Sequence, residues 1–383
     1  MGCGSSAIEN RKVIVVGGGY AGTAAAKELD SVCDVTLITP NEDLEHKWAY
    51  MRACVVPGWE KVTRVPLDKL LKNGEIKRGK VTSVQDGSVT LESGEVLNAD
   101  NIILAQGYGS GNLPGGTPSN ISDSVSFQNR LKEKQVAVSE ASTILIIGGG
   151  PVGVELSGEI KAHFPNKTVK LVHSNAKLLS NSQPPMVDAS LTKLNSTLQD
   201  MGIEVILNAR VSNLPKPENG DGFIHGSKSY ELSNGLSVKA DLAVVCIGGM
   251  KSDTSLVAAE CVDEDNRIKV NESLQVDGLS TVFCVGDANN VKETKLGYFG
   301  GLQAAVAVKN IKKLAQNEKL TVYKPAGGDT QYGVMMIPLG PSRGVIGMGK
   351  NVMGDFMTSK IKGQGLFKKK VFAGVNATVP SAP

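Results

Sequence analysis

The sequence has few cysteines, and none of them are closely spaced. Six cysteines are scattered over 383 residues, and they form neither a C-x-x-C nor a C-x₄-C pair. This scatter argues against a disulfide framework, a zinc site and a dithiol reductase, because all three need thiols close together. The cysteine usage indicates a reducing compartment.

Long apolar runs are also missing, since no stretch approaches the roughly 18–20 residues that a membrane span requires. The first dozen residues, MGCGSSAIENRK, lack the apolar segment of a secretory signal. The formal net charge of +3 is too small to indicate a nucleic-acid partner. With 41% hydrophobic and 21% charged residues, the sequence predicts a soluble globular protein of two or three domains.

What the sequence does contain is an internal repeat of one strand–glycine turn–helix–strand unit. Lys12–Gly19 reads KVIVVGGG and is followed by AGTAAAKEL and DVTLIT. Thr143–Gly150 reads TILIIGGG and is followed by PVGVELSGEIKAHF and TVKLVH. Each order is that of a βαβ unit. Two copies about 130 residues apart predict one fold used twice.

Each copy carries a G-x-G-x-x-G fingerprint between its strand and its helix. The first copy spans Gly17, Gly18, Gly19, Tyr20, Ala21 and Gly22, and the second uses Gly148, Gly150 and Gly153. The glycines permit the tight turn, the approach of a pyrophosphate and close helix–strand packing. The helix N-terminus supplies free N–H groups and a positive dipole to the phosphates. Two such sites predict a redox enzyme that holds one dinucleotide and takes a hydride from another.

Both copies depart from the usual pattern about 20 residues on, where an acid binds the adenine ribose. The first strand ends at Thr39, with Asn41, Glu42 and Asp43 just after it. The second copy has His173 at this position. Without an acid, the second site need not repel a 2′-phosphate, so the sequence leaves both NADH and NADPH open.

The order of these motifs resembles the two-dinucleotide-binding-domain flavoproteins, and within them the apoptosis-inducing-factor-like and ferroptosis suppressor family. The family's strand-end motif A-T-G is here Ala105-Gln106-Gly107. Its later motif T-x-x-x-x-h-G-D runs from Thr281 to Asp287. The resemblance covers nearly the whole chain. It implies FAD on the first unit, with Gly107 and Asp287 at the cofactor, and NAD(P)H on the second unit, at Gly148, Gly150, Gly153 and His173.

The implied fold is α/β, with two Rossmann-type FAD and NAD(P)H modules (three-layer β/β/α-type) and a small α+β C-terminal domain. The expected division is a flexible leader (1–11), a discontinuous FAD-binding domain (12–118 and 251–322), an NAD(P)H-binding domain (119–250) and a C-terminal domain (323–383).

The resemblance also implies four further site residues. Arg52 and Val81 match positions that contact FAD, while a solvated arginine and a core valine are the structural alternatives. Glu155, expected in the first turn of its helix, matches a carboxylate near the nicotinamide–flavin contact, and a surface glutamate is the alternative. Lys362 matches a lysine implicated in oxygen or quinone chemistry at the flavin. The alternative for Lys362 is a solvated basic face, since Arg343–Lys370 holds seven cations and one anion.

The N-terminus fits M-G-x-x-x-[ST], in which myristate is attached to Gly2. One acyl chain binds membranes only marginally, but Cys3 offers a palmitoylation site and Lys368, Lys369 and Lys370 form a basic patch. These features predict attachment to the cytosolic face of a membrane with a cytoplasmic pool. A flexible leader of small residues is the alternative.

Together these observations predict an FAD-dependent enzyme that passes electrons from NAD(P)H to a lipophilic, ubiquinone-type quinone. One alternative is a type II NADH dehydrogenase of a respiratory or plastid membrane, although those enzymes usually carry a longer amphipathic C-terminal region. Another is an NAD(P)H-responsive redox sensor or apoptosis-related interaction protein. The sequence leaves a homodimer, the identity of the quinone and the identity of the membrane open.

Overall fold

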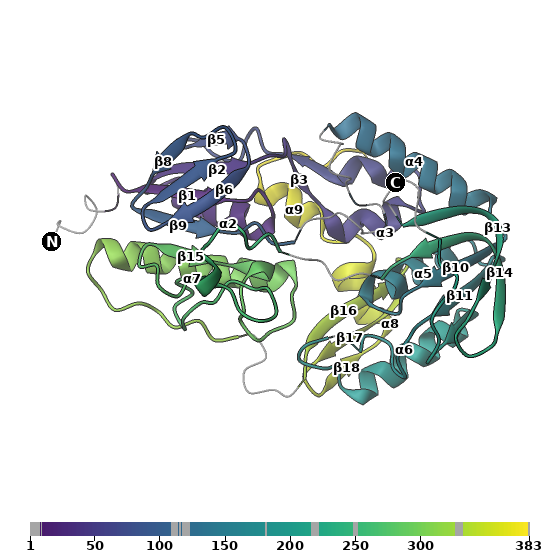
Figure 1. Cartoon of the computed structure of the whole chain (residues 1–383). Coiled ribbons are helices and arrows are strands. Elements are labelled where there is room, and N and C mark those ends of the chain that lie inside the picture. Colours follow the sequence, from purple (N-terminus) through teal and green to yellow (C-terminus); the bar gives the residue numbers. More distant parts are fainter. Residues whose placement is uncertain are drawn as a thin grey trace.

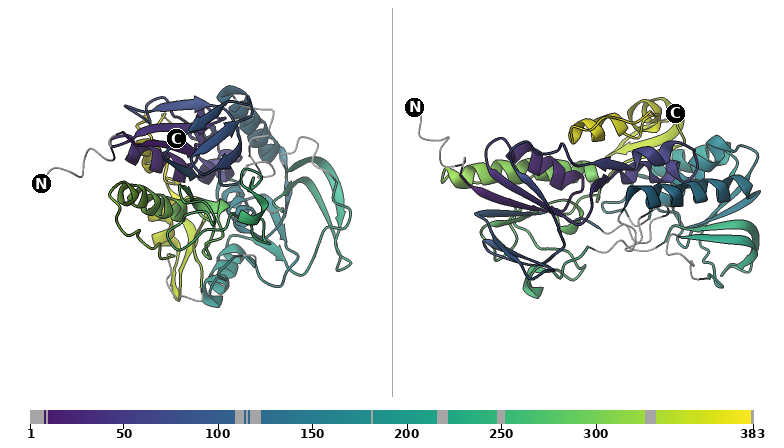
Figure 2. Two further views of the ribbon diagram at one scale, coloured as in Figure 1. Left: turned by 60° about the vertical axis from the view of Figure 1, so that its left-hand side comes forward. Right: turned by 90° about the horizontal axis from the view of Figure 1, so that it is seen from above.

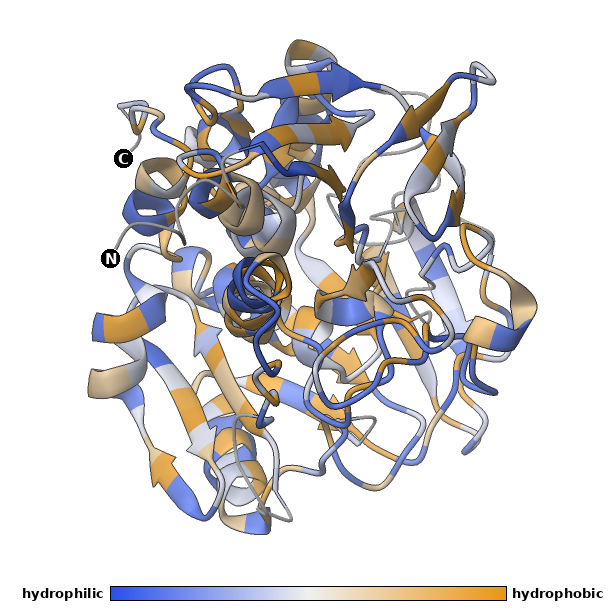
Figure 3. Ribbon diagram, turned by 90° about the vertical axis from the view of Figure 1, so that its left-hand side faces the viewer, coloured by the Kyte–Doolittle hydropathy of each residue, from blue (hydrophilic) through white to orange (hydrophobic). Residues whose placement is uncertain are grey.

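The computed structural model describes residues 8, 10–108, 114, 116, 123–180, 182–215, 222–247, 252–325 and 332–381. Two sheets, each with helices packed on it, stand side by side, and a third, smaller sheet lies next to the second (Figure 1). Hydrophobic residues recur along the strands and helices of these layers (Figure 3).

The first sheet is parallel and has the strand order β15-β9-β1-β2-β5. Its strands are β1 (Lys12–Val16), β2 (Asp34–Thr39), β5 (Glu75–Arg78), β9 (Asn101–Leu104) and β15 (Val282–Cys284). Helices α2 (Tyr20–Leu29) and α7 (Gly297–Ala315) belong to the layer on one face. The antiparallel sheet of β6 (Val81–Gln85), β7 (Ser88–Leu91) and β8 (Val96–Asn98) covers the other.

The alternation along β1 explains why two layers are needed. Val13 and Val15 are buried with the helices, whereas Ile14 and Val16 are buried with β6–β8. A strand with apolar side chains on both faces must be covered on both faces. This arrangement gives the predicted three layers.

The second sheet has the order β12-β11-β10-β14-β13 and is parallel except for the antiparallel edge strand β13. Its strands are β10 (Thr143–Ile147), β11 (Thr168–Val172), β12 (Ile203–Ile206), β13 (Phe223–Glu231) and β14 (Ser237–Val245). The helices of this half are α4 (Ser124–Glu140), α5 (Pro151–His163) and α6 (Asp188–Asp200).

The C-terminal segment connects the two modules. It contains the antiparallel strands β16 (Val334–Leu339), β17 (Arg343–Met348) and β18 (Asn351–Met353), then α8 (Asp355–Thr358), a π-helix (Ser359–Gly363) and α9 (Lys368–Gly374). The sheet packs on α5 so closely that a Cβ at Gly158 would lie 2.5 Å from Leu339 Cα. At the other end, Lys27 of α2 donates to the carbonyl oxygens of Ala373 and Gly374 at 3.1 and 2.9 Å. Figure 2 shows this yellow segment lying across both halves.

Short elements complete the chain between these layers. They are β3 (Asp43–Glu45), β4 (Arg64–Pro66), α3 (Tyr50–Ala53) and the 3₁₀ turns Lys47–Ala49, Trp59–Val62, Ala259–Cys261 and Gly286–Ala288.

One buried apolar cluster takes side chains from both Rossmann-type modules and from the C-terminal sheet, among them Val15, Ile146 and Ile337. The predicted α/β fold with two Rossmann-type modules is confirmed, and the residue limits of the three domains stay a proposal. Within the described residues, no helix combines the length and the apolar character that a membrane crossing needs.

Candidate active site

Both glycine turns lie at the carboxyl ends of their parallel strands. Gly17 has φ +112° and Gly148 has φ +121°, a region that side chains with a Cβ rarely adopt. A Cβ at Gly17 would lie 2.6 Å from the Ala105 carbonyl oxygen, and one at Gly148 would lie 2.6 Å from that of Cys246. The neighbouring strand therefore leaves room only for glycine at each turn.

In each module, the last fingerprint glycine is tightly packed and the one at the start of the helix is open. A Cβ at Gly22 would lie 1.9 Å from the Gly17 carbonyl oxygen, and a Cβ at Gly153 would lie 2.0 Å from that of Gly148. At Gly19 and Gly150, by contrast, a Cβ would meet no described heavy atom within 4 Å. Each helix thus starts with open backbone beside a tight turn, which is the geometry that a pyrophosphate group needs.

The residue that ends the second strand of each unit supports the middle glycine. A Cβ at Gly18 would lie 2.8 Å from Thr39 Oγ1, and a Cβ at Gly149 would lie 2.8 Å from the ring of His173. The His173 Nδ1 accepts a hydrogen bond from the Gly149 N–H at 3.2 Å, and its Nε2 lies 3.1 Å from Ser180 Oγ. Burial lowers the pKa of His173, so the ring is neutral. Both ring nitrogens are used within the protein, and a ribose contact at His173 stays a prediction.

A cavity of about 1130 Å³ opens in front of the Gly148–Gly150 turn. Its walls come mainly from the second module, and Tyr108, Arg267 and residues 293–296 of the first module and Met335 of the C-terminal sheet complete them. Three cationic residues line it, namely Arg210, Arg267 and Lys295. The acid on its wall is Glu293, whose carboxylate accepts from Gln303 Nε2 at 2.5 Å and from the Tyr323 hydroxyl at 2.9 Å. A cavity with this charge balance suits an anionic ligand.

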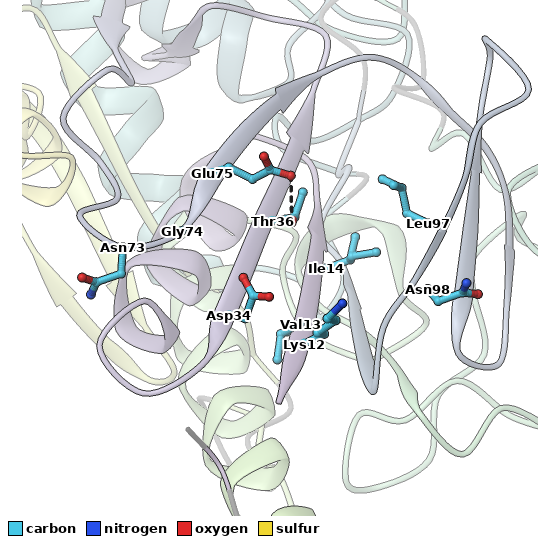
Figure 4. Close-up of a pocket in the computed structure, with 10 residues that line it drawn as sticks. All are labelled: Lys12, Val13, Ile14, Asp34, Thr36, Asn73, Gly74, Glu75, Leu97 and Asn98. Carbon is cyan, nitrogen blue, oxygen red and sulfur yellow. Dashed lines mark hydrogen bonds between the residues drawn. The ribbon is translucent and has the colours of Figure 1, made fainter. Parts of the chain in front are cut away.

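A second cavity, of about 450 Å³, lies at the opposite end of the first sheet, where its strands begin (Figure 4). Lys12 and Asp34, the first residues of β1 and β2, line it, as does the Thr36–Glu75 pair joined at 3.3 Å. Ligands of open α/β sheets bind outside the carboxyl ends of the strands. This cavity is therefore not the candidate active site.

The predicted FAD residues Gly107 and Asp287 also lie at carboxyl ends of the first sheet. Gly107 follows β9 with φ +56°, and its carbonyl oxygen accepts from Ser252 Oγ at 3.0 Å. Asp287 lies in the turn after β15, where a Cβ at Gly286 would lie 3.8 Å from the Ala21 methyl group. Burial raises the pKa of Asp287, and Lys295 is the largest opposing influence.

An aromatic group stands beside the first fingerprint. Tyr20 stacks on Trp48 with ring centroids 4.2 Å apart, and Phe367 meets the edge of Trp48 at 5.3 Å. The Tyr20 hydroxyl is hydrogen-bonded with His46 Nδ1 at 2.9 Å. Burial lowers the pKa of His46 to about 3, so this histidine is neutral within the aromatic group.

Arg52 forms a buried ion pair with Glu159 of α5. Its Nε and Nη2 donate to the two carboxylate oxygens at 2.9 and 2.7 Å, and its Nη1 donates to the Gln364 carbonyl oxygen at 3.2 Å. Only 2% of each side chain is exposed, so the alternative of a solvated arginine is wrong. The pair joins the first module, the second module and the C-terminal segment. A contact between Arg52 and FAD stays a prediction.

Glu155 and Lys362 form an ion pair. The Lys362 Nζ donates to Glu155 Oε1 at 2.8 Å and to the Met336 carbonyl oxygen at 3.1 Å. The side chains are 13% and 11% exposed, so the readings of a surface glutamate and of a solvated basic face are wrong for these two. Glu155 is the fifth residue of α5 and lies one turn into the helix, not in its first turn. Burial raises the pKa of Glu155, and Lys362 opposes that rise.

The other predicted positions lie elsewhere or outside the described residues. Val81 begins β6, and its side chain is buried with β6–β8. Lys368 lies over the Trp59 ring at 4.6 Å, while Lys369 and Lys370 are exposed. Gly2 and Cys3 fall outside the described residues.

Sequence reasoning missed three residues of this region, namely Glu159, Arg210 and Lys295. Glu159 follows Glu155 by four positions, so the two acids share one face of α5, and this spacing was a readable signal. Arg210 and Lys295 lie in loops, and their approach to the cavity depends on tertiary structure.

The described cysteines Cys33, Cys54, Cys246, Cys261 and Cys284 are free thiols. Cys246 lines the large cavity, but burial raises its pKa. Thiol exchange needs a thiolate, which a raised pKa disfavours.

Each of the two Rossmann-type modules has a glycine turn that can accommodate a pyrophosphate. This combination is typical of an oxidoreductase that binds two dinucleotides. Residues 11–316 match the pyridine nucleotide-disulphide oxidoreductase family, and the chain belongs to that family. It is 31% identical over 391 residues to apoptosis-inducing factor homolog B of Dictyostelium discoideum, covering 97% of this chain and 98% of that protein. It is 30% identical over 392 residues to ferroptosis suppressor protein 1 of Xenopus tropicalis, covering 99% and 100%.

Among solved structures, the fold is similar to that of the sulfide:quinone oxidoreductase from Aquifex aeolicus. The TM-score is 0.71 and the identity 18%, over 95% of this chain and 92% of that one. The chain is an FAD-dependent NAD(P)H oxidoreductase.

Proposed function

We propose that this enzyme passes electrons from NAD(P)H to a lipophilic quinone at a membrane surface. The observation that carries this proposal is the Glu155–Lys362 ion pair, because it places an acid and a base together where the second module meets the C-terminal segment. When bound, FAD supplies the two-electron chemistry between nicotinamide and acceptor.

The first module would hold FAD. Gly17–Gly22 would take the pyrophosphate, since Gly19 is open and a Cβ there would occupy that space. Gly107 and Asp287 would face the cofactor from the ends of β9 and β15. Arg52 would act indirectly, because its guanidinium is committed to Glu159 and Gln364.

The second module would hold NAD(P)H in the cavity before Gly148–Gly150. Glu155 would position the nicotinamide or move a proton. Lys362 would stabilise negative charge on the acceptor oxygen, since a fixed ammonium group is most effective where little water reaches it. Both side chains are held in place by their mutual hydrogen bond.

The acceptor is proposed from three observations. The described cysteines are free and include no disulfide. The structurally similar Aquifex enzyme is a sulfide:quinone oxidoreductase. Phe356, Met357 and Ile361, which we call the apolar triplet, are 72%, 39% and 38% exposed and lie within the six residues before Lys362. Lys360, Lys369 and Lys370 are exposed in the same segment, and this combination favours an anionic membrane surface.

The test is an absorption titration of the purified protein under anaerobic conditions. NADH should bleach the flavin bands, and a short-chain ubiquinone analogue should restore them. Lys362→Met should leave the bleaching of the flavin by NADH unchanged. It should slow the recovery of the flavin bands on quinone addition by about 100-fold, which is typical of losing one charge-stabilising donor. A protein that bleaches but ignores the quinone would exclude this acceptor.

Membrane attachment is tested separately by flotation with anionic vesicles. Phe356→Glu combined with Met357→Glu should lower the bound fraction and leave flavin bleaching by NADH unchanged. Mass spectrometry of protein from a eukaryotic host checks acylation at Gly2 and Cys3, and an unmodified Gly2 would exclude the myristoyl anchor.

A further inference from the structure

The loops after β11 and β12 are joined to each other by main-chain hydrogen bonds. His173 N donates to the Ile206 carbonyl oxygen at 2.8 Å, Ala209 N to that of His173 at 3.0 Å, and Asn208 N to that of Asn175 at 3.2 Å. This pairing continues the sheet beyond its assigned end. It fixes residues 173–175 beside residues 206–209, and Arg210 follows directly.

Arg210 is an exposed arginine on the wall of the cavity before Gly148–Gly150. Its main chain is held by the pair with Ser233, at 3.0 Å to Ser233 Oγ and 2.8 Å from Ser233 N. Among the described residues, its guanidinium forms no hydrogen bond or ion pair. A fixed backbone with an uncommitted cation is the arrangement of a residue that can bind an anion from the cavity.

Ser174 and Asn175 line the same part of the cavity and bear no charge. Asn175 Nδ2 donates to Ser180 Oγ at 2.7 Å, so its amide is held in place. The acid that usually binds the 2′-hydroxyl of the adenine ribose is replaced here by His173. Because both nitrogens of the His173 ring are used by Gly149 and Ser180, recognition of this ribose falls to the residues that follow.

We propose that Arg210, together with Ser174 and Asn175, forms a subsite for the 2′-phosphate of NADPH and makes NADPH the preferred donor. The planar guanidinium matches a phosphate through two parallel N–H···O bonds, and the Ser174 hydroxyl, which donates to Asn175 Oδ1 at a long 3.4 Å, can turn to add a third donor. The acid on the cavity wall, Glu293, already accepts from Gln303 and Tyr323, and Arg210, Ser174 and Asn175 bring no carboxylate that would repel the phosphate. This subsite rests on the proposed placement of the nucleotide on the second module.

The experiment is isothermal titration of the FAD-loaded protein with 2′,5′-ADP and with 5′-AMP. The two probes differ only in the 2′-phosphate, and neither takes part in electron transfer. The wild type should bind 2′,5′-ADP at least about tenfold more tightly, the size expected for one charge-assisted contact. Arg210→Gln should reduce that ratio to about threefold or less without changing the affinity for 5′-AMP. The ratio in the wild type should also fall with added salt.

Two further variants fix the interpretation. Ser174→Asp restores an acid next to the ribose and should reverse the preference toward 5′-AMP. Lys177→Ala removes a nearby cation that is paired with Asp188 at 2.7 Å and does not line the cavity, and it should leave the ratio unchanged.

Equal affinities in the wild type, or an Arg210→Gln variant that keeps the wild-type ratio, would overturn the subsite. If neither probe binds, the placement of the nucleotide on this module is wrong and the subsite falls with it. Loss of quinone turnover alone would leave these affinities unchanged.

Discussion

Arg78 ends β5 in the first module, and Arg210 follows β12 in the second, yet the two arginines are used differently. Arg78 donates to the carbonyl oxygens of Asn41 and Glu42, the second of them at 3.2 Å. Its charge orders the loop after β2. Arg210 has a fixed backbone and a guanidinium directed to no protein group among the described residues. The two arginines lie near the ends of corresponding strands without being at equivalent positions, and one orders a loop whereas the other lines the cavity.

A parallel difference concerns the residue behind the middle glycine. Thr39 meets Gly18 through a small side chain, and its Oγ1 accepts from the Asn41 N–H at 3.3 Å. His173 fills the same place with a ring whose two nitrogens hold Gly149 and Ser180. One backbone scaffold therefore accepts two quite different supports, provided that the turn glycines are kept.

The largest effect is expected from breaking the buried Arg52–Glu159 ion pair, which connects the two modules. Arg52→Met should lower the free energy of unfolding by about 3–5 kcal/mol, because it leaves the buried Glu159 carboxylate with only the ring of His163, 3.7 Å away, beside it. Denaturant titration measures this loss. Replacing both residues with apolar side chains should recover part of it.

The matched control for that change is the Lys170–Glu204 pair of the second module, 2.9 Å long, whose side chains are 27% and 54% exposed. Lys170→Met should cost about 1 kcal/mol or less. A similar cost for Arg52→Met would mean that the modules do not depend on this pair.

The next largest effect is expected from substitutions in the two glycine turns, because each should weaken the binding of a different cofactor. Gly22→Ala should release FAD, and Gly153→Ala should keep the flavin but weaken nucleotide binding. Each new methyl group meets a carbonyl oxygen at about 2 Å, and we expect a penalty of about 3 kcal/mol, or roughly 100-fold in affinity. The visible-to-ultraviolet absorbance ratio reports FAD, and titration with 5′-AMP reports the second site. Gly301→Ala, where a Cβ would meet nothing within 4 Å, is the control and should change neither.

A smaller, pH-dependent effect is expected from the buried acids. Burial raises the pKa of Glu155, as it does that of Asp287 in the first module. Between the ordinary pKa and the raised one, the folded state keeps a proton that the unfolded state has lost. The stability contribution of Glu155 therefore falls as pH rises above about 4.3.

Denaturant titrations of the wild type and of Glu155→Gln across this range measure that contribution. The stability difference, wild type minus variant, should decrease with rising pH. A difference that grows with pH would contradict the raised pKa.

The smallest effect is expected at Arg78. Arg78→Gln removes exposed hydrogen bonds to main-chain carbonyl oxygens and should cost about 1 kcal/mol or less, with FAD retained. Thermal unfolding of the FAD-loaded protein checks this. A loss of flavin comparable to that of Gly22→Ala would show that the first arginine also binds ligand and would remove the contrast with Arg210.

The repeated strand–glycine–helix pattern was sufficient to predict the α/β fold and its two Rossmann-type modules, because local periodicity and the Gly17 and Gly148 turns determine those units. The family resemblance predicted FAD and NAD(P)H. The contact between Glu155 and Lys362 could not be predicted, because it joins residues 207 positions apart. The same holds for Arg52 and Glu159, 107 positions apart.

The C-terminal helices illustrate the other limit of sequence reasoning. The segment after β18 contains a π-helix at Ser359–Gly363, and Leu366 and Phe367 have positive φ values of 44° and 60°. Such backbone angles are uncommon outside glycine and carry no clear sequence signal. They are held by packing, since Leu366 is 2% exposed within the main core.

The double hydrogen bond of His173 constrains how this enzyme could evolve. A change at position 173 removes support from the Gly149 turn at the same time as it alters the ribose environment, so most such changes carry a double penalty. The side chains at positions 174, 175 and 210 do not support the Gly149 turn in this way. Drift in the choice of electron donor should therefore proceed through these three positions, and a lineage that exchanges one nucleotide for the other is expected to keep residue 173 until last.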